Sequence, residues 1–263
     1  MTPDETFEAH TRATSNADSL GLLALAAVAE AAGDARYCII GGYMVRMLQL
    51  VYPTPRAVLR STRDADAAVE SVEVIGPIAQ RLQMQHFEKK GGNLFTKQTA
   101  DEQEIEINVL MPRSDSSRGI RPKNVPGLGQ VDTLPELTFA LSGPGLAVDV
   151  TADLLDGSSI EFRTRVPRLE VAAVLKAHSW KARGLSDPKD LADLHSLMEV
   201  RQEHPEAPWR LDEAPLHGYR LDGARLLHEL AGKLTKRTSM MPVPSHVERP
   251  RMAALIAQHI ARP

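Results

Sequence analysis

Apolar residues recur along the chain in two distinct patterns, which divide it into a mixed N-terminal part and a helical C-terminal part. Short continuous or alternating apolar runs predict strands at 37–40, 64–69, 104–110, 147–150 and 159–162. A helical repeat of apolar positions predicts helices at about 16–32, 43–51, 72–84, 169–182, 187–200, 224–233 and 250–261. The order of these elements places all the strands before residue 165.

Residues of known capping and turn chemistry set the expected ends of these elements. Asn16 or Asp18 is expected to cap the first helix, and Asp187 the helix that Pro188 begins. A hairpin is expected around 91–93, where two glycines and an asparagine separate two short apolar runs. Residues 1–16 and 112–130 are polar and are expected to be loops.

The pattern of apolar positions changes after Pro167, and this change predicts two domains, at 1–165 and 166–263. The first combines strands and helices and the second has helical periodicity alone, so the predicted fold class is α+β followed by a helical domain. No internal repeat and no low-complexity tract interrupts either part.

Composition narrows the class of protein without naming a function. The 263 residues are 43% hydrophobic and 25% charged, as in ordinary globular proteins, and a net charge of −3 gives no general attraction to nucleic acid. The single cysteine, Cys38, excludes an intrachain disulfide and a Cys-rich zinc site. The acidic N-terminus lacks the basic region of a signal peptide, and the apolar run 20–29 is too short to span a bilayer. We therefore expect a cytoplasmic protein that does not enter a membrane.

Gly41-Gly42 separates a buried strand from a helix. Glycine lets the backbone approach a ligand closely, and a helix N-terminus offers free N–H groups to phosphate. This turn is a candidate nucleotide-binding position, although a tight strand-to-helix turn alone has the same sequence.

Asp64 and Asp66 lie two residues apart in a predicted strand, so both side chains project from one face. Two carboxylates on one face suit Mg²⁺, which takes oxygen ligands and keeps several waters and substrate phosphates. Salt bridges with Arg60 and Arg63 are the alternative explanation.

A third carboxylate on a neighbouring strand would complete a two-metal site. Glu106 lies between two isoleucines on a strand with one polar face, which makes it the first candidate. Asp149, between Val148 and Val150, is a rival.

Two adjoining predicted helices of the second part carry charges of opposite sign, with basic residues on the first helix and acidic residues on the second. Lys176 and Arg183 share a helix face, and Lys181 lies to the side of it. Asp190 and Asp193 face the same way on the next helix. These residues are able to form a structural salt-bridge lattice or to hold a triphosphate.

Taken together, Gly41-Gly42, Asp64, Asp66 and Glu106 occur in the order found in the polymerase-beta-like nucleotidyltransferase superfamily, which the sequence resembles. The resemblance implies an N-terminal domain of that fold with a mixed sheet. Two positions depart from the superfamily pattern: Gly42 replaces its usual serine, and Glu106 replaces its usual third aspartate.

The pattern Arg60-x-Thr62-x-Asp64-x-Asp66, Lys176-x4-Lys181 and Lys189-Asp190-x-x-Asp193 further resembles the AbiEii-type (MenT-like) nucleotidyltransferase toxins. The resemblance covers most of residues 37–200. In that family the glycines and paired aspartates form the NTP and metal site, and a lysine and a later aspartate are required for activity. The lysine corresponds to Lys176, with Lys181 as rival, and the aspartate to Asp190, with Asp193 as rival.

This resemblance implies a toxin that transfers a nucleotide from an NTP to the 3′ end of tRNA, with Mg²⁺ or Mn²⁺ as cofactor and an antitoxin protein as partner. Modification of a protein or small molecule, or binding without catalysis, are the alternatives. Basic residues that are candidates for RNA phosphate contacts are Arg113, Arg118, Arg121, Lys123, Arg163, Arg165 and Arg168.

Overall fold

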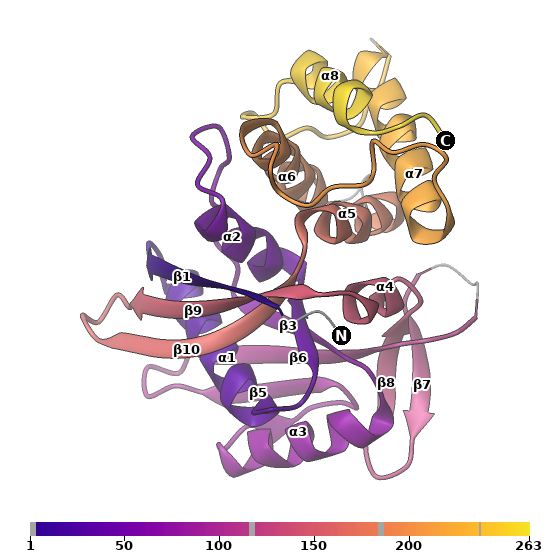
Figure 1. Cartoon of the computed structure of the whole chain (residues 1–263). Coiled ribbons are helices and arrows are strands. Elements are labelled where there is room, and N and C mark those ends of the chain that lie inside the picture. The colour runs from indigo at the N-terminus through magenta and orange to yellow at the C-terminus, as the bar shows by residue number, and fades with distance from the viewer. Residues whose placement is uncertain (1–3, 116–118, 184–186, 237) are drawn as a thin grey trace. The chain divides into compact units, whose positions relative to one another are not determined.

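The computed structural model describes residues 4–115, 119–183, 187–236 and 238–263, which contain ten strands and eight helices (Figure 1). By their internal contacts the residues form two compact units. The N-terminal unit comprises Met1–Val51 and Arg60–Pro167, and the helical unit comprises Tyr52–Leu59 and Arg168–Pro263. All ten strands belong to the N-terminal unit, which confirms the predicted α+β class with a helical C-terminal part.

The larger sheet of the N-terminal unit is mixed. Its main strand order is β2 (Tyr37–Ile40), β3 (Asp64–Val69), β6 (Glu104–Pro112), β5 (Leu94–Gln98) and β4 (Glu88–Lys89). The strands β3 and β6 are parallel, and β2–β3, β6–β5 and β5–β4 are antiparallel. The end of β6 also pairs in parallel with β8 (Gly129–Leu134), and β8 pairs with β7 (Arg121–Val125). The predicted hairpin is confirmed as β4–β5.

The smaller sheet contains β1 (Glu5–Arg12), β9 (Gly145–Asp153) and β10 (Ser159–Pro167) (Figure 1). The strand β1 runs parallel to β9, and β10 is antiparallel to it. The expectation of a loop over residues 1–16 is therefore wrong for β1. Ala9 and Thr11 are buried while Glu8 and His10 are exposed, which is the alternation of a half-buried strand.

Two further expectations about loops and caps are corrected. The predicted loop 112–130 contains β7 and the start of β8, whose pairing closes this segment into a hairpin. Ser15, rather than Asn16 or Asp18, is the N-cap of α1 (Asn16–Ala32), because its Oγ accepts the backbone N–H of Asp18 at 3.2 Å. The short helix α4 (Leu137–Ser142) is not among the elements that the apolar pattern predicts.

Helices α2 (Gly41–Val51) and α3 (Val72–Met84) complete the N-terminal unit. Helix α2 begins at Gly41 itself, directly after β2, so the two glycines form its first turn. Helix α1 contacts β3 and β6 of the larger sheet and β10 of the smaller one, so its buried leucines and alanines join the two sheets.

The helical unit consists of α5 (Leu169–Arg183), α6 (Lys189–Glu203), α7 (Gly218–Thr235) and α8 (Arg249–His259). The N-cap of α6 is Pro188 rather than the expected Asp187, which lies one residue earlier and accepts the backbone N–H of Lys189 at 3.0 Å. Residues 52–59 belong to this unit because they contact α6 and His204, the residue that follows it. The Ser196 hydroxyl donates a hydrogen bond to the Val58 carbonyl at 3.4 Å, and His204 Nε2 lies 3.0 Å from the Pro53 carbonyl.

A buried ion pair attaches α2 to the start of α1. Arg46 Nη1 lies 2.7 Å from Asp18 Oδ1, and the two side chains are only 4% and 1% exposed. The backbone N–H and hydroxyl of Thr14 also donate to the Asp18 carboxylate. Burial alone would raise the pKa of Asp18, but the Thr14 hydrogen bonds and the Arg46 charge hold it below its ordinary value.

Across the residues that the structure describes, none of the helices is both long and apolar enough to span a lipid bilayer.

We predict that Arg46→Met lowers the free energy of unfolding by about 3–5 kcal/mol at pH 7, because Asp18 is left as an uncompensated buried charge. Since the folded-state pKa of Asp18 is lowered, its contribution is complete above the ordinary carboxyl pKa and is lost as pH falls through the folded pKa. The difference between wild type and variant should therefore shrink in acid. Urea denaturation across pH 3–7 measures both effects.

Arg163→Met is the matched control, because Arg163 pairs with Asp149 at 3.6 Å on the surface of the same unit. This exposed pair should contribute no more than about 1 kcal/mol. Equal losses in the two variants would contradict a stabilising role for the buried pair.

Candidate functional site

The end of β2 and the start of α2 lie directly against Asp66. In the antiparallel pairing of β2 with β3, Ile40 is opposite Asp66, and Gly41 follows Ile40. A Cβ atom on Gly41 would be only 2.3 Å from Asp66 Oδ2, and the backbone φ of Gly41 is +69°. Only glycine meets both conditions without strain. The predicted Gly-Gly turn and the predicted Asp-x-Asp strand are therefore brought together at one point.

The second glycine has polar side chains against it. A Cβ atom on Gly42 would lie 2.7 Å from Arg60 Nη2 and 2.7 Å from Thr62 Oγ1. Thr62 is 9% exposed, and its hydroxyl lies 3.5 Å from Asp64 Oδ1. A guanidinium and a hydroxyl thus approach the first turn of α2 beside the aspartate strand.

Glu106 is adjacent to Asp64 across the parallel β3–β6 pair, and Asn108 is adjacent to Asp66. The Asn108 amide donates to Glu106 Oε1 at 3.5 Å. All four side chains are partly exposed, while Ala65 and Ile107 on the opposite faces of these strands are buried. Polar oxygens from two neighbouring strands therefore share one accessible surface.

Within the described ranges, no group of three or more His, Cys, Asp or Glu side chains is arranged to hold a metal ion. Asp64, Asp66 and Glu106 therefore do not form a closed three-ligand cage. Two carboxylates with open positions nevertheless match the ligand set of Mg²⁺, which keeps waters and substrate phosphate oxygens in its coordination shell. The donor chemistry at Asp64 and Asp66 fits such an ion.

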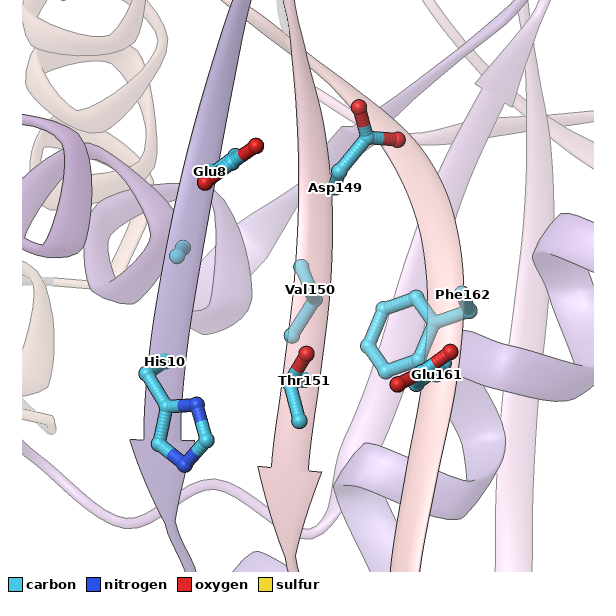
Figure 2. Close-up of a pocket in the computed structure, with 8 residues that line it drawn as sticks. Glu8, His10, Asp149, Val150, Thr151, Glu161 and Phe162 are labelled. Atoms are coloured by element: carbon cyan, nitrogen blue, oxygen red, sulfur yellow. The ribbon is translucent and has the colours of Figure 1, made fainter.

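Asp149, the rival third acid, lies on β9 of the smaller sheet and is ion-paired with Arg163 at 3.6 Å. It lines an open pocket of about 830 Å³, which has Glu8 and His10 of β1 and Glu161 of β10 around it (Figure 2). Asp64 and Asp66 do not line this pocket. Asp149 therefore belongs to a charged surface separate from that of Asp64 and Asp66.

Lys176 lies in a buried charge cluster of the helical unit. Its Nζ is 2.5 Å from Asp193 Oδ2 and 3.3 Å from Asp190 Oδ1, and the three side chains are 5%, 4% and 2% exposed. Arg183, which is 54% exposed, also binds Asp190, at 3.0 Å. The structure thus brings together Lys176, Arg183 and both candidate aspartates.

Lys181 is held elsewhere on α5. Its Nζ lies 2.6 Å and 2.7 Å from the two carboxylate oxygens of Glu229 on α7. The two candidate lysines consequently bind carboxylates of different helices.

The candidate RNA-binding cations are in different environments. Arg121 and Lys123 are exposed on β7, whereas Arg113 is 8% exposed and binds the Thr133 carbonyl. Arg165 binds Asp4 at 2.6 Å. Arg118 lies outside the described residues. Among the described candidates, Arg121 and Lys123 on β7 and Arg163 on β10 are therefore the exposed cations, and Arg163 is paired with Asp149.

Sequence reasoning assigned no site role to the positions of Arg60 and Thr62, although both belong to the motif on which the family resemblance rests. The available signal was their period-two spacing with Asp64 and Asp66, which places alternate residues of an extended chain on one side. The spacing alone does not predict that Arg60 and Thr62 lie against Gly42, because that approach depends on the pairing of β2 with β3.

The chain matches no protein-family model and no curated protein. Among solved structures it is similar to an antigenic nucleotidyltransferase-like protein from Paracoccidioides brasiliensis, with 14% identity and a TM-score of 0.45 over 94% of this chain and 95% of that chain. It is also similar to the Bradyrhizobium diazoefficiens CD-NTase CdnG in complex with GTP, with 12% identity and a TM-score of 0.26 over 84% of this chain and 76% of that chain. Both likenesses are distant, so the function is inferred from the geometry described above.

We predict that Gly41→Ala destabilises the protein by about 1–3 kcal/mol, because the residue must leave its positive φ and the Asp66 carboxylate must move. Gly232→Ala is the matched control, since Gly232 lies within helix α7 and a Cβ at this position meets nothing within 4 Å. That change should be neutral or should stabilise by up to about 1 kcal/mol. Urea denaturation of both variants tests the contact, and equal stabilities would contradict it.

Proposed function

We propose that this protein is a metal-dependent nucleotidyltransferase that transfers a nucleoside monophosphate from an NTP to an acceptor hydroxyl. One observation carries the proposal: the Asp66 carboxylate lies against Gly41 at the start of α2, with Asp64 two residues before it on the same strand face. This geometry supports the proposal because it sets a helix N-terminus, which suits phosphate, beside two carboxylates, which suit a divalent cation.

Each of these groups has a role in the proposed reaction. The free N–H groups of the first turn of α2 bind the phosphates, and Asp64 and Asp66 hold Mg²⁺ or Mn²⁺, with Glu106 as the third acid. An ion held by these carboxylates would supply positive charge against the phosphates and would lower the pKa of the attacking hydroxyl. The acceptor oxygen forms a bond to the α-phosphorus as the bond to the β-phosphate oxygen breaks. Pyrophosphate leaves, and a carboxylate or water takes the hydroxyl proton.

The helical unit is proposed to supply the lysine and aspartate that the family resemblance calls for, Lys176 and Asp190, with Lys181 and Asp193 as the rivals. The 3.3 Å contact between Lys176 and Asp190 supports a positioning role for Asp190 rather than a role as base. Because Lys176 is buried with both aspartates, this cluster also stabilises the helices that it joins.

The proposed acceptor is the 3′ end of tRNA, and the proposed setting is the cytoplasmic toxin of a toxin–antitoxin pair. Both come from the resemblance of the motifs to the AbiEii-type enzymes. Exposed Arg121 and Lys123 on β7 support contacts to a nucleic-acid backbone.

We predict that the purified protein, incubated with Mg²⁺, total tRNA and each α-³²P-labelled NTP in turn, transfers label to tRNA. Asp66→Asn should reduce the label by about 100-fold or more, because a ligand of the metal is lost. Asp149→Asn is the matched control: it removes a strand acid from the smaller sheet and should leave labelling within about twofold of wild type. Glu106→Gln should lower the label if it supplies the third acid.

Other outcomes change specific parts of the proposal. Label on protein or on an added small molecule, with none on tRNA, would retain the reaction and replace the acceptor. No label on any acceptor, with NTP still bound in the presence of Mg²⁺, would identify a binding protein without catalysis. Equal labelling by Asp66→Asn and wild type would reject the metal site.

A further inference from the structure

We propose that the free edge of β1 binds a second copy of this chain, whose own β1 adds antiparallel to it and joins the two smaller sheets into one. The occupant is therefore an identical strand, Glu5–Arg12 of another molecule. The inference concerns assembly of the protein and does not depend on the proposed reaction.

The first argument is that β1 is the end strand of the smaller sheet within the residues that the structure describes, since the order is β1-β9-β10. The N–H of Ala13, directly after β1, donates to the Asp153 carbonyl at 2.8 Å. Alternate residues of a strand direct their backbone groups to opposite sides, so the odd-numbered residues of β1 bond to β9. The N–H and C=O groups of Thr6, Glu8 and His10 consequently point away from it. Such a row of backbone groups is a template for another strand.

The open part of this edge covers residues 6–10. Glu8 and His10 are exposed, and Figure 2 shows them along β1, the outermost strand of this view. The edge is closed beyond them, because Arg46 Nη2 donates to the Arg12 carbonyl at 3.2 Å. A pairing strand therefore has one short, defined stretch to bind.

The second argument is that the other end strands are protected. The Tyr37 hydroxyl donates to the Arg163 carbonyl of β10 at 3.4 Å, all four residues of β2 are buried, and β4 has only two residues. The strand β7 contains Pro122 between the cations Arg121 and Lys123, which would repel the same strand of a second copy. Proline, like charges, short strands and covering groups are the usual protection of sheet edges. The strand β1 contains neither proline nor lysine.

The third argument is that β1 is complementary in charge to itself in one antiparallel register. With Ala9 on the two-fold axis, Glu8 of each copy lies opposite His10 of the other. His10 Nε2 lies 3.6 Å from Asp153 Oδ2, which leaves Nδ1 to bond the Glu8 carboxylate of the second copy. Registers centred on Glu8 or on His10 would instead set two carboxylates or two imidazoles opposite each other, which is unfavourable.

The same register fits the backbone. Glu8 and His10 both have outward-pointing N–H and C=O groups, so each Glu8–His10 pair exchanges both of its backbone hydrogen bonds. Ala9 then faces Ala9 of the second copy in a pair without hydrogen bonds, where Cα atoms approach to about 4.5 Å and a small side chain is suited. The product is a continuous sheet with three strands from each copy.

The test measures the association of the full chain by sedimentation equilibrium from about 1 µM to 1 mM, the range of weak complexes. We expect wild type to show a monomer–dimer equilibrium. Glu8→Pro should raise the dimer Kd by about tenfold or more, because it removes a donor on both copies. Proline is tolerated at an edge strand where the lost N–H points away from the sheet, so the fold should be retained.

Glu161→Pro is the matched control on the opposite edge of the same sheet. The Leu154 N–H donates to the Ser158 carbonyl at 2.8 Å, so the even-numbered residues of β10 bond to β9 and the N–H of Glu161 points away. This variant should leave the dimer Kd within about twofold of wild type.

A charge exchange keeps the test decisive if Glu8→Pro folds poorly. His10→Glu sets carboxylates opposite each other across the axis and should raise the dimer Kd by about fivefold or more. The double variant Glu8→Lys with His10→Glu restores opposite charges and should return the Kd to within about threefold of wild type. Misfolding does not produce such a rescue.

Two results overturn the inference. One is a wild type that stays monomeric over the whole concentration range. The other is a dimer whose Kd changes in neither Glu8→Pro nor His10→Glu, because the copies then associate through another surface. Either result leaves the proposed nucleotidyl transfer as it stands, since the labelling assay measures that reaction separately.

Discussion

The close approach of the Asp66 carboxylate to the backbone of Gly41 is the constraint on which the candidate site depends. It requires a residue without a side chain, a positive φ, and antiparallel pairing that sets Ile40 opposite Asp66. Because α2 starts at the same residue, the helix N-terminus cannot move away from the aspartate strand without breaking the pairing of β2 with β3. A single sterically restricted contact therefore fixes the position of the α2 N-terminus relative to the Asp64 and Asp66 carboxylates.

The rest of the N-terminal unit holds α2 against this contact. The Tyr43 hydroxyl donates to the Asp18 carbonyl at 3.0 Å, and Arg46, one turn after Gly42, pairs with the Asp18 side chain. Gly21 allows the Tyr43 ring to lie against α1, since a Cβ there would be 2.3 Å from the hydroxyl. These contacts are buried and hydrogen-bonded, so the first turns of α2 are attached to α1 on one side and to β3 on the other. Rigid attachment of this kind suits a site that acts by positioning and charge neutralisation.

The sequence predicted what local patterns determine. The strands bearing Asp64 and Glu106 follow from alternation, and the Gly41-Gly42 turn follows from glycine after an apolar run. It could not predict contacts that depend on tertiary pairing. The segment 5–12 is polar by itself and becomes a strand only because β9 pairs with it. Likewise, helical spacing separated Lys176 from Lys181, but their carboxylate partners depend on how α6 and α7 pack against α5.

The parallel pairing of β1 with β9 has a consequence for the order in which the protein is made. Asp4 bonds to the backbone of Gly145, 141 residues later in the chain. During synthesis the β1 segment therefore leaves the ribosome long before β9 has been made. It stays unpaired in solvent while the intervening residues are added. Contacts of such long sequence separation form slowly because a large loop has to close. The smaller sheet is consequently expected to assemble late, after the larger sheet, whose strands between residues 37 and 134 lie closer together in the chain.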